Sequence, residues 1–219
     1  MKYKLIINLK AYPQATGDLA IKIGKVVKKL ELKAKNKNVE IILCPQNIDL
    51  KDLIKLKIKV FAQHIDGYEP GAHTGYNIAE NLKKIGISGS LIDHSEHLLS
   101  LDEIKLRIDL CKKLNLMSCV CARDVKIAKK IANLNPDFIA VEPKELIGGD
   151  ISISTAKPEL IKKSVEVIGD IELLVGAGVK NAGDVRKSIE LGAKGILVAS
   201  GVIKAKNIEL AIIDLLEGF

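Results

Sequence analysis

Residues 140–149 contain a carboxylate that could act as a base beneath a closing loop. They read Ala-Val-Glu-Pro-Lys-Glu-Leu-Ile-Gly-Gly, so Glu142 ends an apolar run and stands directly before Pro143. Proline fixes the backbone at one end of the segment, and Gly148 and Gly149 free it at the other, so the residues between them could move as one unit. The alternative is an ordinary strand-to-helix turn with a solvated glutamate. Which of the two applies depends on the side chains that surround Glu142.

Short runs rich in β-branched residues alternate with lysine-rich amphipathic stretches along the whole chain. Eight runs are predicted to be strands, at residues 4–8, 39–44, 58–63, 90–93, 116–121, 138–142, 172–176 and 195–199. Eight stretches are predicted to be helices, at about residues 18–34, 48–56, 78–86, 101–114, 124–133, 158–168, 181–191 and 205–217. Several strand runs are apolar continuously, as expected for parallel strands covered on both faces. This alternation predicts an α/β fold, a closed (β/α)8 barrel.

The barrel is expected to form one domain over residues 1–219. No linker rich in Pro, Gly and Ser and no low-complexity tract divides the chain. An open doubly wound sheet is the rival fold, but its Gly-x-Gly-x-x-Gly turn would follow the first strand. The chain has Asn8-Leu9-Lys10 at that place.

In a barrel the loops after the strands carry the chemistry, so residues at those ends are the candidates for function. They are, in chain order, Asn8 and Lys10; Cys44, Pro45 and Gln46; Gln63 and His64; His94, Ser95 and Glu96; Arg123; and Glu142. The last two strands end in the small-residue turns Gly176-Ala177-Gly178 and Ala199-Ser200-Gly201. Small residues let backbone N–H groups approach a ligand, and helix N-termini add partial positive charge. Together with Gly148-Gly149, these turns predict a phosphate site.

Several short motifs, taken together, resemble the triosephosphate isomerase family. They are Asn8-Leu9-Lys10, His94-Ser95-Glu96, Val141-Glu142-Pro143 through Ile147-Gly148, and Val198-Ala199-Ser200, in that order along the chain. The segment from Ala62-Gln63 through Gly71-Ala72-His73-Thr74-Gly75 is also similar to the long third loop of the family. The resemblance covers essentially the whole chain and implies a TIM barrel. The short length is similar to the archaeal branch, with shortened helices in the second half of the barrel.

The sequence departs from the family pattern around the expected site. Asp93 stands where glycine is usual, and His97 stands where arginine is usual. The turn Gly176-Ala177-Gly178 lacks the serine that often contributes there, which would make the phosphate site more purely main-chain.

The resemblance implies a glycolytic and gluconeogenic enzyme that interconverts dihydroxyacetone phosphate and D-glyceraldehyde 3-phosphate through an enediolate. Glu142 would be the base, His94 the neutral hydrogen-bond donor to both oxygens, and Lys10 the positive charge beside the enediolate. Asn8 would assist by hydrogen bonding, and Glu96 would be a polar neighbour. Substrate and phosphate would be bound by Asn8, Lys10, Ile147, Gly148, Gly178, Ala199 and Ser200. No cofactor and no metal ion are expected.

The histidines divide into one catalytic candidate and others with plainer roles. His64 and Asp66 are too few ligands for a metal site, and His97 is expected to make polar contacts. His94 is expected to remain neutral, because Ser95-Glu96-His97 would begin a helical turn whose dipole disfavours imidazolium.

Composition argues against several other classes of function. The net charge of +7 comes almost wholly from lysine spread over predicted helix faces, and aromatic residues make up only 3% of the chain. A nucleic-acid site would need clustered basic residues interleaved with aromatics, so no nucleic-acid partner is expected, whereas the charge would attract an anionic small substrate.

With no signal peptide and no apolar run of bilayer length, the protein is expected to be cytoplasmic, without a membrane partner. The cysteines, at 44, 111, 119 and 121, are expected to be buried and reduced.

Two alternative functions remain open at this point. One is another phosphate-binding barrel enzyme, such as a pentulose-phosphate epimerase, but an epimerase would bring metal-binding His and Asp residues to several strand ends. A basic barrel that binds nucleic acid without catalysis would not require Glu142, His94 and Lys10 together.

The protein is expected to form a homo-oligomer, as a dimer of dimers. Residues 64–77 are too long for a structureless connector, and the resemblance implies that they cross a two-fold axis and set Thr74 beside Lys10 of the neighbour. The helix predicted at 101–114 has two apolar stripes, one with Leu101, Ile104, Ile108 and Cys111 and the other with Leu106, Leu110 and Leu114. One stripe would pack on the barrel, so the other would be covered by a second dimer to form a tetramer.

Overall fold

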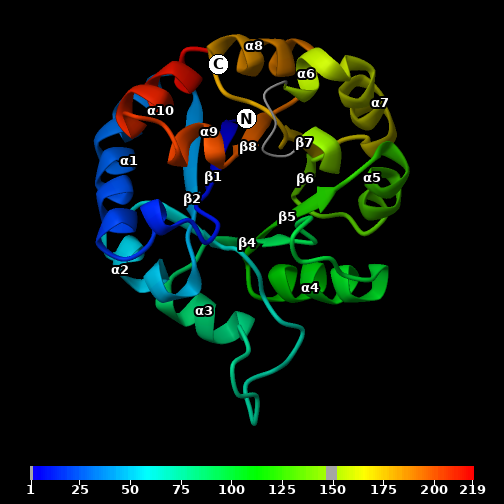
Figure 1. The fold of residues 1–219 in the computed structure, drawn as a ribbon. Coiled ribbons are helices and arrows are strands. Elements are labelled where there is room, and N and C mark those ends of the chain that lie inside the picture. The colour runs from blue at the N-terminus through cyan, green and yellow to red at the C-terminus, as the bar shows by residue number, and fades with distance from the viewer. Residues whose placement is uncertain (1, 147–151) are drawn as a thin grey trace.

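The structure is a computed structural model that describes residues 2–146 and 152–219. Eight parallel strands close into a barrel, in which each strand pairs with the next along the chain and β8 pairs with β1. The strands are β1 (Tyr3–Asn8), β2 (Val39–Cys44), β3 (Lys59–Ala62), β4 (Gly89–Ile92), β5 (Met117–Ala122), β6 (Phe138–Val141), β7 (Glu172–Val175) and β8 (Gly195–Val198). Figure 1 shows the helices arranged around this ring. The predicted (β/α)8 barrel is confirmed.

The helices around the barrel lie where the amphipathic stretches predict them. They are α1 (Asp18–Asn36), α2 (Leu50–Lys55), α3 (Ala79–Ile85), α4 (Leu101–Lys113), α5 (Val125–Ala132), α7 (Pro158–Ile168), α8 (Ala182–Glu190) and α10 (Ile208–Leu216). In the second half, α5, α7, α8 and α10 have 8, 11, 9 and 9 residues, against 19 in α1 and 13 in α4. In the first half, α2 and α3 are short as well, at 6 and 7 residues.

Short helical turns also occur in the loops that follow four of the strands. They are η1 (Pro13–Ala15), η2 (Asn47–Asp49), η3 (Lys144–Leu146), α6 (Ile153–Ala156) and α9 (Ser200–Ile203). These turns lie at the carboxyl end of the barrel, where the candidate functional residues are expected.

The core consists of two apolar layers, because successive side chains of a strand point to opposite faces. One layer lies inside the barrel and includes Ile6, Phe61 and Leu174, and a larger one lies between the strands and the helices. All four cysteines are free and buried, as predicted. Cys119 and Cys121 belong to the inner layer, where burial raises the pKa of both thiols well above the ordinary value.

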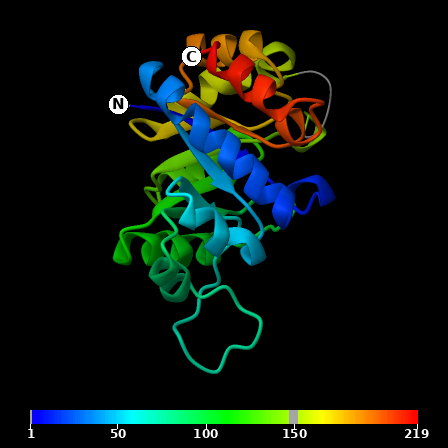
Figure 2. The ribbon, with the colours of Figure 1, turned by 90° about the vertical axis from the view of Figure 1, so that its left-hand side faces the viewer.

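Residues 64–77, named loop 3 here, project away from the barrel (Figure 2). The base of loop 3 is closed because the Asp66 N–H donates to the Asn77 carbonyl at 2.9 Å, and the Asn77 N–H donates to the Asp66 carboxylate at 2.6 Å. Further out, the rings of Tyr68 and His73 stack with centroids 4.7 Å apart. The loop is therefore organised by its own contacts.

Helix α4 exposes fewer apolar side chains than its sequence suggests. Ile104, Ile108 and Cys111 of the first stripe pack against the barrel, as predicted, but Leu101 of the same stripe is 39% exposed. On the second stripe, Leu106 is 45% exposed, but Leu110 is only 8% exposed. The prediction that this whole stripe is available to a partner is therefore wrong for Leu110, which is buried within its own chain.

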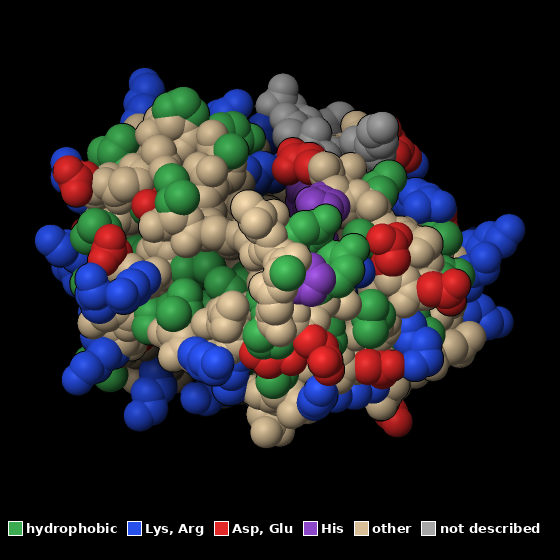
Figure 3. Space-filling model, turned by 90° about the horizontal axis from the view of Figure 1, so that it is seen from below, with side chains coloured by type: hydrophobic (Ala, Val, Ile, Leu, Met, Phe, Trp, Pro, Cys, Tyr) green, Lys and Arg blue, Asp and Glu red, His purple; other side chains and the backbone are tan. Residues whose placement is uncertain are grey.

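Charged side chains are distributed over the surface, as far as one face shows. In Figure 3, Lys and Arg are scattered around the rim with Asp and Glu among them, and hydrophobic side chains occupy part of the centre. None of the helices in the described residues combines the length and the apolar character needed to cross a membrane.

Candidate active site

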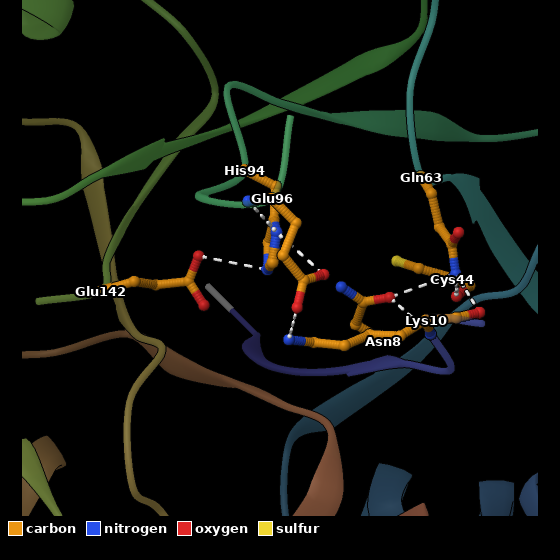
Figure 4. Close-up of polar contacts among 7 residues, drawn as sticks. All are labelled: Asn8, Lys10, Cys44, Gln63, His94, Glu96 and Glu142. Atoms are coloured by element: carbon orange, nitrogen blue, oxygen red, sulfur yellow. Dashed lines mark hydrogen bonds and ion pairs between the residues drawn. The ribbon is translucent and has the colours of Figure 1, made fainter. Parts of the chain in front are cut away.

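The four predicted catalytic residues come together at the carboxyl end of the barrel (Figure 4). Asn8, Lys10, His94 and Glu142 all line one pocket, and residues after β7 and β8 line it as well. His94 Nε2 lies 3.6 Å from Glu142 Oε2, although the two residues follow different strands. Imidazole and carboxylate therefore face the same small space, where both could reach one substrate.

Glu142 directly follows β6 and is placed by the barrel itself. Its N–H donates to the Ala122 carbonyl at 2.9 Å, so the ladder between β5 and β6 continues through its backbone. Glu142 is 4% exposed, and Oε2 has no hydrogen-bond partner among the described residues. Burial raises the pKa of Glu142, while His94 and a hydrogen bond from the Cys121 thiol act in the opposite direction. The result is a carboxylate that binds a proton more readily than a solvated glutamate.

His94 is oriented by the turn that contains it rather than by a helix. The His97 N–H donates to the His94 carbonyl at 2.7 Å, and α4 begins only at Leu101, so the helical turn expected at 95–97 is a simple hydrogen-bonded turn. The Glu96 N–H donates to His94 Nδ1 at 3.3 Å. Because Nδ1 accepts this bond, a neutral imidazole carries its proton on Nε2, the nitrogen nearest Glu142.

Lys10 and Asn8 are held by one hydrogen-bond network. The backbone of Lys10 has a φ of 47°, and its N–H donates to Asn8 Oδ1 at 2.9 Å. Gln63 Nε2 donates to the same oxygen at 3.2 Å and to the carbonyls of Lys10 at 3.0 Å and Cys44 at 2.9 Å. Gln63 was predicted only as a residue at a strand end, and its amide joins the first three strand ends in a single network.

The sequence predicts Glu96 only as a polar neighbour, but its carboxylate contacts both Lys10 and His94. Its Oε1 lies 2.7 Å from Lys10 Nζ, and its Oε2 lies 3.6 Å from His94 Nδ1. The side chain of Lys10 is 13% exposed, so its ammonium group is held at the pocket instead of moving in solvent.

The predicted phosphate residues lie only partly within the described residues. Gly178, Ala199 and Ser200 line the same pocket as the catalytic candidates, and Gly178 has a φ of 70° that favours glycine. Ile147 and Gly148 lie outside the described residues, as does the end of the predicted lid.

Other predicted or possible site residues have different positions. Thr74 is exposed on loop 3 and does not line the pocket. A second cleft beside Lys10 is lined by His64 and Asn77, and by no further residue of loop 3. Tyr12 and Lys180 line the pocket, although no local motif points to either. Within residues 2–146 and 152–219, no three His, Cys, Asp or Glu side chains are grouped as a metal site.

Comparison with known proteins gives one consistent result. A sequence model of the family described as triosephosphate isomerase matches residues 4–216. A triosephosphate isomerase of Methanocaldococcus jannaschii is 41% identical, with 97% of this chain and 98% of that protein covered. Those of Methanobrevibacter smithii and Thermoplasma volcanium are 39% and 42% identical, with 96% and 94% of this chain covered and 96% and 95% of theirs. These matches favour neither an epimerase nor a nucleic-acid-binding barrel.

Proposed function

The chain belongs to the triosephosphate isomerase family, and we propose that Glu142, His94, Lys10 and Asn8 carry out the reaction of this family. The enzyme interconverts dihydroxyacetone phosphate and D-glyceraldehyde 3-phosphate without a cofactor. This reaction moves a proton between adjacent carbons and needs a base, a donor to both oxygens and a countercharge.

Glu142 is the base in this proposal. Its ionised carboxylate removes a proton from the carbon next to the carbonyl of dihydroxyacetone phosphate, which leaves an enediolate and a neutral carboxylic acid. A proton then passes from the hydroxyl oxygen of that carbon to the former carbonyl oxygen, and the acid returns its proton to the neighbouring carbon, which gives D-glyceraldehyde 3-phosphate and restores the carboxylate. Burial supports this role because a carboxylate with a raised pKa accepts a proton from carbon more readily.

His94 donates to the oxygens between which negative charge moves. Nε2 faces the pocket. Because Nδ1 accepts the hydrogen bond from the Glu96 N–H, this bond favours the tautomer that carries its proton on Nε2. A neutral imidazole can hydrogen-bond to either oxygen in turn, whereas an imidazolium would first lose a proton to the enediolate.

Lys10 supplies the positive charge beside the enediolate, and Asn8 holds the backbone from which Lys10 extends. In the structure Lys10 is paired with Glu96 at 2.7 Å. An anionic substrate in the pocket would compete with Glu96 for the ammonium group, so binding of the substrate would shift Lys10 towards the reacting oxygen.

In this proposal the phosphate binds beside Gly178, Ala199 and Ser200. These residues line the pocket, where small side chains let backbone N–H groups approach an anion, and Lys10 at the same pocket adds positive charge. Ile147 and Gly148 would complete this site from the lid.

The observation that carries the proposal is the 3.6 Å separation of His94 Nε2 and Glu142 Oε2 in the pocket that Lys10 also lines. A coupled assay with D-glyceraldehyde 3-phosphate in the presence of a chelator tests it. Glu142→Gln should lower kcat by about a hundredfold or more, because general base catalysis contributes about that much. Glu166→Gln, on the exposed side of α7, is the matched control and should keep wild-type activity.

Binding separates loss of the base from loss of the site. Because Glu142→Gln preserves shape and leaves Lys10 in place, glycerol 3-phosphate should still bind within a few-fold of wild type. If Glu142→Gln retained activity within a few-fold of wild type, the assignment of the base would be wrong.

Three features extend the proposal beyond the site. We expect residues 1–219 to act as one domain, the protein to be cytoplasmic, and the assembly to be a tetramer in which Thr74 of one chain lies beside Lys10 of another. The exposure of Thr74 on a loop that projects from the barrel supports the last of these.

A further inference from the structure

Asp93 is a buried carboxylate that the mechanism above does not use. It directly follows β4, is 6% exposed and has a backbone φ of 57°. That left-handed conformation is easiest for glycine, and Asn and Asp tolerate it better than other residues. Glycine would therefore satisfy the backbone at this position, so the side chain of Asp93 calls for a separate explanation.

The carboxylate closes the loop that carries His94. Asp93 Oδ1 accepts a hydrogen bond from the Leu99 N–H at 2.7 Å, which ties the two ends of the loop together. Inside this ring the His97 N–H donates to the His94 carbonyl at 2.7 Å, and the Glu96 N–H donates to His94 Nδ1 at 3.3 Å. The hydrogen bond from the Glu96 N–H, which orients the imidazole, thus lies within the segment 93–99 that the Asp93 carboxylate closes.

The surroundings of Asp93 solvate its carboxylate poorly. Burial raises its pKa, while the Leu99 N–H and the guanidinium of Arg123 act in the opposite direction. Its side chain lines a small cavity together with Cys121 and Glu142. Asp93 therefore shares a cavity with Glu142 and directly precedes His94 in the chain.

We propose that Asp93 is a positioning residue for the isomerase reaction, and that its carboxylate oxygen holds the His94 loop so that Nε2 faces the substrate. This inference rests on the proposed role of His94. It assigns a function to a buried side chain that the proposed mechanism does not otherwise use. The acceptor oxygen is what matters, so asparagine should replace Asp93 and glycine should not.

The test compares Asp93→Gly, which keeps the backbone conformation without the acceptor, with Asp93→Asn, which keeps both. Asp93→Gly should lower kcat about tenfold, because small displacements of catalytic groups cost about one to two orders of magnitude. KM should change less than about twofold, because Lys10 and the phosphate loops are untouched. Asp93→Asn should restore kcat to within about twofold of wild type, because the amide oxygen accepts the same bond. Asn135→Gly removes a side chain at another left-handed position, outside the site, and is the matched control.

Nitrogen-15 NMR of the histidine side chains adds a measurement that a purely structural role would not change. Wild type and Asp93→Asn should show His94 as the Nε2–H tautomer, whereas Asp93→Gly should show a mixture of tautomers. The inference is overturned if Asp93→Gly keeps wild-type kcat and tautomer, or if Asp93→Asn is as impaired as Asp93→Gly. His94→Asn separates the two levels: if it is fully active, the proposed role of His94 fails, and if it is inactive while Asp93→Gly is active, only the role of Asp93 fails.

Discussion

A Cβ atom on Gly176 would lie 2.4 Å from Cγ of Glu142 and 2.9 Å from its Oε1. The base therefore occupies space that any other residue after β7 would fill. Because Glu142 is buried, its side chain cannot simply swing into solvent to avoid such an atom. The turn Gly176-Ala177-Gly178, predicted as a phosphate turn, thus has a second role in making room for the carboxylate.

We predict that Gly176→Ala lowers kcat by about tenfold or more, because the added methyl group displaces the base from its position. Binding of glycerol 3-phosphate should change less, since Gly178 and Ser200 keep their places in the phosphate site. The control is Gly183→Ala in the first turn of α8, whose Cβ would meet only the amide oxygen of Asn181, at 3.1 Å. Equal kcat for Gly176→Ala and wild type would show that the carboxylate has room to move.

The pH dependence of activity should follow the raised pKa of Glu142. Only the ionised carboxylate can accept a proton, so kcat/KM should rise with pH through a pKa above the ordinary range of glutamate. The measurement is kcat/KM across the acidic range with substrate well below KM. An acid limb at the ordinary glutamate pKa would mean that burial does not tune the base.

The pH dependence of folding stability should also follow Glu142, but in the opposite direction to that of activity. Because the folded state binds the Glu142 proton more tightly than the unfolded chain does, the stability that this proton contributes is present at low pH and is lost as pH rises through the raised pKa. Glu142→Gln should therefore unfold at a higher temperature than wild type at neutral pH, and the difference should vanish below the ordinary pKa of glutamate. A Tm difference that does not vary with pH would contradict this.

The predicted lid, residues 143–149, should protect the enediolate from losing its phosphate. Shortening this segment should lower turnover and raise the amount of inorganic phosphate released for each isomerisation. Phosphate release and isomerisation are measured in the same reaction. If their ratio does not change, the segment is only a connector.

The assembly should contain about four chains in sedimentation at micromolar concentration. Leu106→Glu should yield smaller particles, because a charge buried in an apolar contact is strongly unfavourable. Since Leu110 is packed within its own chain, the test uses Leu106 alone. Leu210→Glu changes a leucine that is 61% exposed on α10 and should leave the particle unchanged. A dimeric wild type, or a tetrameric Leu106→Glu variant, would contradict the proposed interface.

The sequence by itself determined the barrel and the elements that carry the site. Continuous apolar runs and amphipathic stretches alternate regularly, and these patterns depend only on neighbouring residues. Parallel strands in a closed barrel all end on one side, so the residues after them had to meet there. For that reason the sequence alone predicts that Asn8, His94 and Glu142 meet at one end of the barrel.

Only the tertiary structure decided which of these residues touch one another. Glu96 reaches Lys10 across 86 positions of sequence, and Gly176 makes room for Glu142 through the pairing of β6 with β7. The burial of Leu110 likewise depends on how α4 lies against its neighbours. Such contacts depend on the register of the strands and on the packing of helices from distant parts of the chain. The pattern of neighbouring residues determines neither.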